Sequence, residues 1–71
     1  MPKLPVVSGE ETVRALAKLG FQVVRQRGSH IVLRKNDLGC VIPDHKELKA
    51  GTLSGILKQA NVSVSAFLKA L

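Results

Sequence analysis

The chain has 71 residues, of which 45% are hydrophobic, and its only aromatic residues are two phenylalanines. This length allows one small domain, which we place at residues 1–71 with a short N-terminal arm at 1–7. The apolar content excludes an intrinsically disordered chain. Eleven Lys and Arg against five Asp and Glu give a net charge of +6. This excess points to a polyanion or an acidic protein as partner, with a merely basic surface as the plain alternative.

The lone cysteine, Cys40, cannot form an internal disulfide, so the chain suits a reducing compartment. The first residues lack the apolar core of a signal peptide, and no run is long and apolar enough to span a membrane. We therefore expect a cytoplasmic protein that does not bind membranes. Cys40 itself fits a small, buried apolar position at the start of a strand.

Residues 8–21 predict the first helix. Ser8 and Glu11 have the three-residue spacing of a capping box, in which each side chain binds a backbone N–H of the first turn. Gly20 can adopt the left-handed conformation that ends a helix. The predicted buried face consists of three apolar residues at helical spacing: Val13, Leu16 and Ala17.

Three short β-branched runs follow, separated by turn residues as in antiparallel hairpins: 21–26, 30–35 and 40–43. Gly28 supplies the first turn, and residues 36–39 supply the second. In the middle run Ile31 and Leu33 occupy alternate positions, so we expect both to face the core. His30 and Arg34 then share the opposite face of the sheet.

Two further helices are predicted at 52–61 and 62–71. Thr52 and Ser63 are the expected N-caps, and Asn61 is the expected left-handed stop. The apolar residues at helical spacing are Leu53, Ile56, Leu57 and Ala60 in the first helix, and Phe67, Leu68 and Leu71 in the second. The order α-β-β-β-α-α predicts an α+β fold, with helices on one face of a three-stranded antiparallel sheet and the other face open.

His30 is the strongest candidate for chemistry. Imidazole, with an unperturbed pKa of about 6.5, can accept and donate a proton at cellular pH. RNA carries its own nucleophile, the 2′-hydroxyl, so its cleavage requires mainly a base, an acid and positive charge at the phosphate. The basic residues near His30 are Arg25, Arg27, Arg34 and Lys35. From the residues alone, a histidine that hydrogen-bonds to backbone at a strand end is the commoner alternative.

Two other residues can support such a site. Ser29 can orient the imidazole or bind a phosphate oxygen, although a serine here is more often a turn residue. His45 can supply the complementary acid or bind phosphate, or it can be a solvated loop residue. The His, Cys and Asp residues between positions 30 and 45 lack the paired short spacings of a zinc site. We therefore expect neither a metal nor a cofactor.

Several motifs occur together in one order: LGF after the first helix, GSH at the start of the middle strand, P-x-H after the third strand, and GTLSGILKQA. In this order, over about residues 5–68, the chain resembles the HicA-type toxins (YcfA-like proteins) of bacterial and archaeal toxin–antitoxin pairs. The resemblance implies a double-stranded-RNA-binding-like fold. It also implies an mRNA interferase that a cognate HicB antitoxin neutralises.

The resemblance further implies that His30 is the catalytic histidine, that Gly28 and Ser29 match its neighbours, and that His45 matches a second recurrent histidine. The chain departs from the family where residues 54–55 replace larger polar or basic residues, and where Asn61 replaces a glycine. The departure at residues 54–55 puts in doubt any contact with nucleic acid or a partner protein from this turn of the predicted helix.

We therefore expect a metal-independent endoribonuclease that cuts mRNA, with RNA and a HicB-like antitoxin as partners. The residues expected to contact RNA are Arg14, Lys18, Arg25, Arg27, Gly28, Arg34, Lys35, Lys46 and Lys49. Two alternatives remain open: a double-stranded-RNA-type module that binds without cleaving, and an inactive remnant that binds only its antitoxin.

Overall fold

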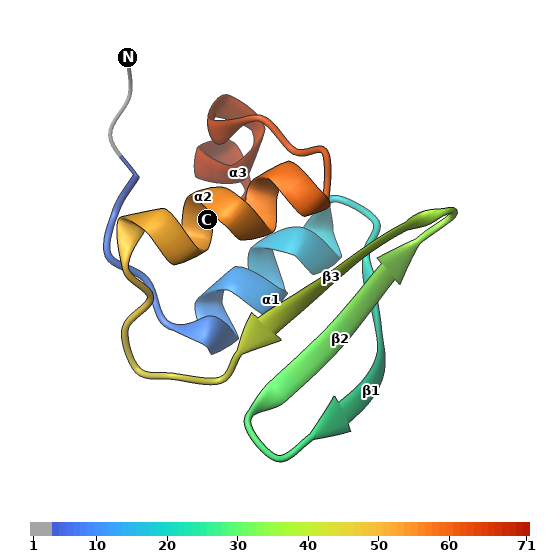
Figure 1. Ribbon diagram of the computed structural model, residues 1–71. Coiled ribbons are helices and arrows are strands. Elements are labelled where there is room, and N and C mark those ends of the chain that lie inside the picture. The colour runs from blue at the N-terminus through green and yellow to red at the C-terminus, as the bar shows by residue number, and fades with distance from the viewer. Residues whose placement is uncertain (1–3) are drawn as a thin grey trace.

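The computed structural model describes residues 4–71. The elements are α1 (Gly9–Lys18), β1 (Gln22–Arg27), β2 (His30–Lys35), β3 (Leu38–Pro43), α2 (Ala50–Gln59) and α3 (Val64–Ala70). The strands form one antiparallel sheet in the order β1-β2-β3, and the helices lie on one side of it (Figure 1). The predicted α+β fold and element order are confirmed. Residues 1–3 of the predicted arm lie outside the described residues.

The start of α1 is fixed by the predicted capping box. The Ser8 hydroxyl accepts a hydrogen bond from the Glu11 N–H at 3.0 Å, and the Glu11 carboxylate accepts one from the Ser8 N–H at 3.0 Å. Two otherwise unpaired backbone donors are thereby satisfied. After the helix, Gly20 has a φ of 102°, as predicted for its end.

The buried face of α1 differs from the prediction. Thr12, Ala15 and Leu16 are buried, whereas Ala17 is exposed. The sequence pattern missed Thr12 because threonine is polar. Its hydroxyl donates to the Ser8 carbonyl at 2.9 Å, so the residue enters the core without an unsatisfied polar group.

Both hairpins have two-residue turns, at 28–29 and at 36–37. Gly28 and Asn36 each have a φ of 54°, the left-handed conformation that such turns favour. Because the second turn is so short, β3 begins at Leu38, two residues before the predicted strand. Ile31 and Leu33 are buried, as predicted, and the sheet thus presents its other side to solvent.

The two C-terminal helices complete the core. All four predicted residues of α2 are buried, but the helix begins at Ala50 with Lys49 as N-cap, so the predicted Thr52 cap is wrong. Just before α2, the Leu48 N–H donates a hydrogen bond to the Val7 carbonyl at 2.7 Å. This bond joins the segment before the helix to the N-terminal arm. Asn61 has the predicted left-handed φ of 55°.

In α3 the predicted Ser63 cap is confirmed: its hydroxyl accepts from the Ala66 N–H at 3.1 Å. Phe67 and Ala70 are buried, whereas Leu71 follows the helix and is 46% exposed, so its predicted place in the apolar stripe is wrong. Across residues 4–71, no helix is long and apolar enough to cross a membrane.

Candidate active site

His30 is the first residue of β2 and is exposed. It pairs with Arg27 on β1 and with Pro43 on β3. Directly opposed residues of antiparallel strands project from the same face, with Cβ atoms about 4.5–5.5 Å apart. Ile31 and Leu33 face the core, so His30 and Arg27 both project from the open face of the sheet.

Two further guanidinium groups belong to the same face. Arg25 pairs with Val32, and Arg34 is two residues beyond Val32 on β2. Both arginines are exposed. Within residues 4–71 the one ion pair is elsewhere, between Arg14 and Glu10, so Arg25, Arg27 and Arg34 have no carboxylate partner in the described structure. We call these three arginines, together with His30, the basic sheet face.

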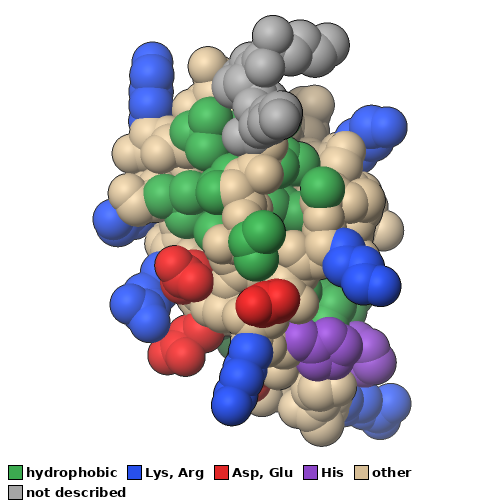
Figure 2. All heavy atoms as spheres, turned by 90° about the vertical axis from the view of Figure 1, so that its left-hand side faces the viewer, with side chains coloured by type: hydrophobic (Ala, Val, Ile, Leu, Met, Phe, Trp, Pro, Cys, Tyr) green, Lys and Arg blue, Asp and Glu red, His purple; other side chains and the backbone are tan. Residues whose placement is uncertain are grey.

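The second histidine lies at the same end of the sheet. The Asp44 N–H donates to the Ser29 carbonyl at 2.6 Å, which joins the β1–β2 turn to the segment after β3. His45 follows directly, and its carbonyl accepts from the Gly9 N–H at 2.8 Å. Two backbone hydrogen bonds thus hold the turn before His30, the loop with His45 and the start of α1 together. Figure 2 shows histidine side chains at one edge of the molecule, near Lys and Arg side chains.

A comparison with protein-family models matched residues 9–62 to the HicA toxin of bacterial toxin–antitoxin systems. The matched segment runs from the start of α1 to beyond the end of α2 and contains both histidines. The chain belongs to the HicA toxin family. Searches of curated proteins and of solved structures found no match. Membership of the HicA family indicates a toxin that is paired with an antitoxin.

Lys35 of this HicA-family chain lies apart from the basic sheet face. It follows Leu33 by two residues and therefore points to the side covered by the helices. Its ammonium group donates to the Leu19 carbonyl at 2.8 Å and lies 5.9 Å from the centre of the Phe21 ring. The side chain thus satisfies a carbonyl at the end of α1, where a positive charge also matches the helix dipole.

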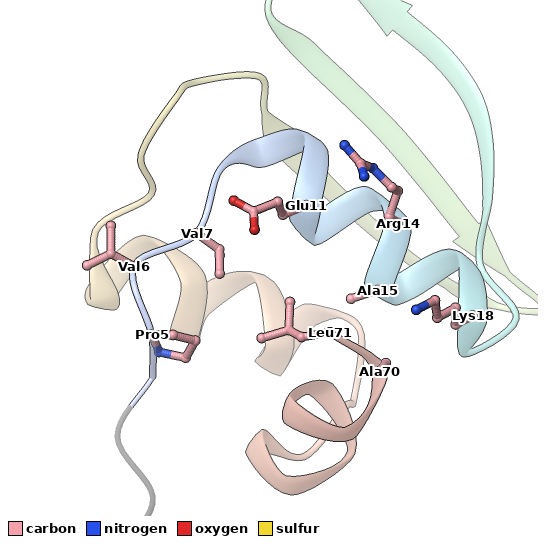
Figure 3. A pocket seen from close by; sticks show the side chains of 9 residues that line it. All are labelled: Pro5, Val6, Val7, Glu11, Arg14, Ala15, Lys18, Ala70 and Leu71. Carbon is pink, nitrogen blue, oxygen red and sulfur yellow. The ribbon is translucent and has the colours of Figure 1, made fainter.

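Arg14 and Lys18 project from α1, in the helical layer. Both line a hollow of about 370 Å³ between the N-terminal arm, α1 and the end of α3 (Figure 3). Because α1 packs against the covered side of the sheet, its exposed residues point away from the basic sheet face. The expected RNA contacts of the HicA chain therefore do not form one surface.

The remaining expected contacts lie in the β1–β2 turn, in the loop after β3 and at the start of α2. Gly28 is in the β1–β2 turn, and Ser29 uses its carbonyl to bind Asp44. Lys46 is exposed in the loop after β3, and Lys49 is exposed at the start of α2. Lys46 thus directly follows His45, and neither Lys46 nor Lys49 has an ion-pair partner in the described part of the HicA chain.

The structure places Cys40 in the core, as the sequence predicted, and burial raises the pKa of its thiol. It is therefore a poor nucleophile or metal ligand at neutral pH. Among residues 4–71, no three His, Cys, Asp or Glu side chains gather closely enough to hold a metal ion.

Sequence reasoning missed Gly9. A Cβ at this position would overlap the Pro43 carbonyl oxygen, and the Gly9 N–H binds the His45 carbonyl. Gly9 thus lets α1 approach the loop that carries His45. The one available sequence signal was a glycine in the first turn of a helix, where it is a poor helix former.

Proposed function

We propose that this HicA-family toxin is an endoribonuclease that cuts mRNA, and that His30 transfers a proton at the scissile phosphate. The observation that carries the proposal is the position of His30: exposed, on the open face of the sheet and directly opposite Arg27. A solvent-facing imidazole beside a guanidinium group offers proton transfer and phosphate binding at one point.

The reaction uses the substrate's own nucleophile. A base removes the proton from the 2′-hydroxyl, the 2′-oxygen attacks the adjacent phosphorus, and the 5′-oxygen leaves with a proton from an acid. The products are a 2′,3′-cyclic phosphate and a 5′-hydroxyl end. His30 is the candidate for one proton transfer, and His45, held at the same end of the sheet, is the candidate for the other.

The arginines would stabilise the charge that develops on the phosphate. Arg27 is closest in register to His30, while Arg25 and Arg34 lie further along the basic sheet face. Phosphate contacts of this kind position a strand and carry little sequence information. The substrate in this proposal is therefore a transcript held by its backbone, and the chemistry requires no metal.

The proposed regulator is a HicB-like antitoxin with an acidic segment. The net charge of +6 favours association with such a partner, and a partner that covers the basic sheet face would exclude RNA. The proposed site of action, the cytoplasm, is where both mRNA and a reducing environment for Cys40 are found.

The test is RNA cleavage by the purified chain in the presence of a chelator, with mapping of the product ends. We expect the unmodified chain to produce 2′,3′-cyclic phosphate ends, and His30→Ala to lose cleavage while it keeps its fold. Equal cleavage by both proteins would remove His30 from the mechanism. Salt-sensitive RNA binding without cleavage by either protein would instead support a binding module.

A further inference from the structure

The outer edge of β3 is an unpaired strand edge. Each hairpin turn has two residues, and the pair that flanks such a turn exchanges both of its backbone hydrogen bonds. The flanking pair of the second hairpin is Lys35 and Leu38. Because hydrogen-bonded and non-hydrogen-bonded pairs alternate, Gly39 and Val41 belong to non-hydrogen-bonded pairs. Their N–H and C=O groups therefore point away from β2.

Pro43 supports this assignment. The same alternation places the His30–Pro43 pair among the non-hydrogen-bonded ones, which suits a residue without an N–H. Outside the sheet ladder, no hydrogen bond within residues 4–71 uses the backbone groups of Gly39 or Val41. Two donors and two acceptors with regular strand spacing thus face outward.

The other edge of the sheet is less suited to pairing. The register of β1 against β2 shifts between Val23 and Arg25, which marks a bulge or irregularity. Such a shift interrupts the regular spacing of outward donors and acceptors and discourages strand addition. The pairing of β3 with β2 is unbroken from His30 to Lys35, so the regular edge of this sheet is the edge of β3.

A shallow groove of about 380 Å³ lies beside this edge. Its lining residues are Val32, Arg34, Gly39, Cys40, Val41 and Gln59. Val41 is 44% exposed, and it pairs with Val32, so two apolar side chains form the middle of the groove. Gly39 stands opposite Arg34 and has no side chain, which leaves the stem of Arg34 uncovered on the side of the open edge.

We propose that the β3 edge accepts an extended, acidic segment of the antitoxin as a fourth strand. Main-chain hydrogen bonds to Gly39 and Val41 would supply affinity, an apolar side chain would cover Val32 and Val41, and a carboxylate would bind Arg34. This inference rests on the antitoxin partner that family membership indicates. It goes beyond the proposed nuclease, because it holds whether or not His30 cleaves RNA.

Charge decides between an acidic partner and a second copy of this chain. No Asp or Glu lines the groove, and Arg34 is its only charged residue. Edge-to-edge pairing of two copies would bring together two chains that each carry a charge of +6. An acidic strand would neutralise Arg34 instead.

Amide hydrogen exchange on the labelled chain, free and in complex with its co-expressed antitoxin, tests the inference. Strand addition is expected to slow exchange at Gly39 and Val41 by at least about 100-fold, a protection typical of strand hydrogen bonds. Gln26, which the same alternation places with its N–H outward on β1, is the internal control and should be unchanged. Unchanged exchange at Gly39 and Val41 in the complex overturns the proposal.

Binding measurements with Val41→Pro and Val41→Ala distinguish strand addition from simple coverage. Proline removes an outward N–H without removing a hydrogen bond to β2, whereas alanine shortens the side chain to one methyl group and keeps the N–H. We expect Val41→Pro to weaken antitoxin binding at least about tenfold more than Val41→Ala. Proline removes one main-chain hydrogen bond to the added strand and leaves the acceptor on that strand unpaired. Equal effects would contradict strand addition.

The free chain provides one further outcome. If it is a dimer that Val41→Pro dissociates, the edge pairs with a second copy and the proposed occupant is wrong. None of these measurements depends on RNA cleavage. A chain that binds its antitoxin through the β3 edge but leaves RNA intact would therefore refute the proposed function and retain this inference.

Discussion

Arg27 and His30 stand directly opposite each other where β1 and β2 meet at their two-residue turn. The pair is fixed by the backbone register, so a guanidinium group and an imidazole project from the same face of the sheet. Two exposed cations of the helical layer, Arg14 and Lys18, lie on a different surface. This contrast allows the proposed site to be tested with matched variants.

Arg27→Ala is expected to slow RNA cleavage by roughly 100-fold, a loss typical of removing one group that stabilises transition-state charge. Lys18→Ala, which removes one positive charge from the helical layer, is the matched control and should change the rate less than about threefold. Single-turnover cleavage rates provide the measurement. A larger loss with Lys18→Ala would move the RNA site to α1.

Arg34 and Lys35 are neighbours in sequence that project to opposite sides of the sheet. Arg34→Ala should lower the slope of log binding constant against log salt by about 0.7–0.9, the value of one phosphate contact. Lys35→Met keeps the apolar stem but loses the hydrogen bond to Leu19. It should leave the salt slope unchanged and lower the free energy of unfolding by about 0.5–1.5 kcal/mol. RNA titrations at several salt concentrations, together with urea unfolding, check both expectations.

Gly9→Ala introduces a Cβ that overlaps the Pro43 carbonyl oxygen, so α1 or the His45 loop must shift. We expect a destabilisation of about 1–3 kcal/mol, as for other overpacked sites, and a loss of cleavage. Gly55→Ala is the control: its Cβ meets nothing within 4 Å, and at this exposed position of α2 it should raise the free energy of unfolding by about 0.5–1 kcal/mol. Denaturant unfolding measures both changes. A change of the same sign in the free energy of unfolding of the two variants would contradict this account.

The buried thiol of Cys40 predicts a loss of stability at high pH. Burial raises its pKa above the ordinary value of 9.0 in the folded chain only. Well below pH 9 the thiol is protonated in both states and contributes no pH dependence. Above pH 9 the unfolded state ionises first, so the free energy of unfolding falls, by at most about 1.4 kcal/mol per pH unit.

The measurement for Cys40 is the urea midpoint between pH 8 and pH 10.5, compared with that of Cys40→Ala. The alanine variant lacks the thiol, so the difference between the two curves isolates it from the lysines that titrate in the same range. Parallel curves would show that the thiol is not protected by burial.

Local interactions were predictable from the sequence because they join residues a few positions apart. The capping box of Ser8 and Glu11, the left-handed Gly20 and the Ser63 cap all depend on short-range geometry. The prediction failed where burial depended on distant contacts. The hydroxyl of Thr12 is satisfied locally by the Ser8 carbonyl, but its burial depends on the face of α1 that packs against the rest of the core.

Three features could therefore be inferred from the residues alone: the element order, the alternation that exposes His30 beside basic residues, and the motif order typical of the HicA family. Which basic residues share a surface depends on how the elements pack. Packing separates Lys35 and Arg14 from the basic sheet face and brings His45 to the end of the sheet that carries His30. The two kinds of feature depend on interactions over different separations along the chain. Strand alternation repeats every two residues, whereas the approach of His45 depends on hydrogen bonds that link Ser29 to Asp44 and Gly9 to His45 across the fold.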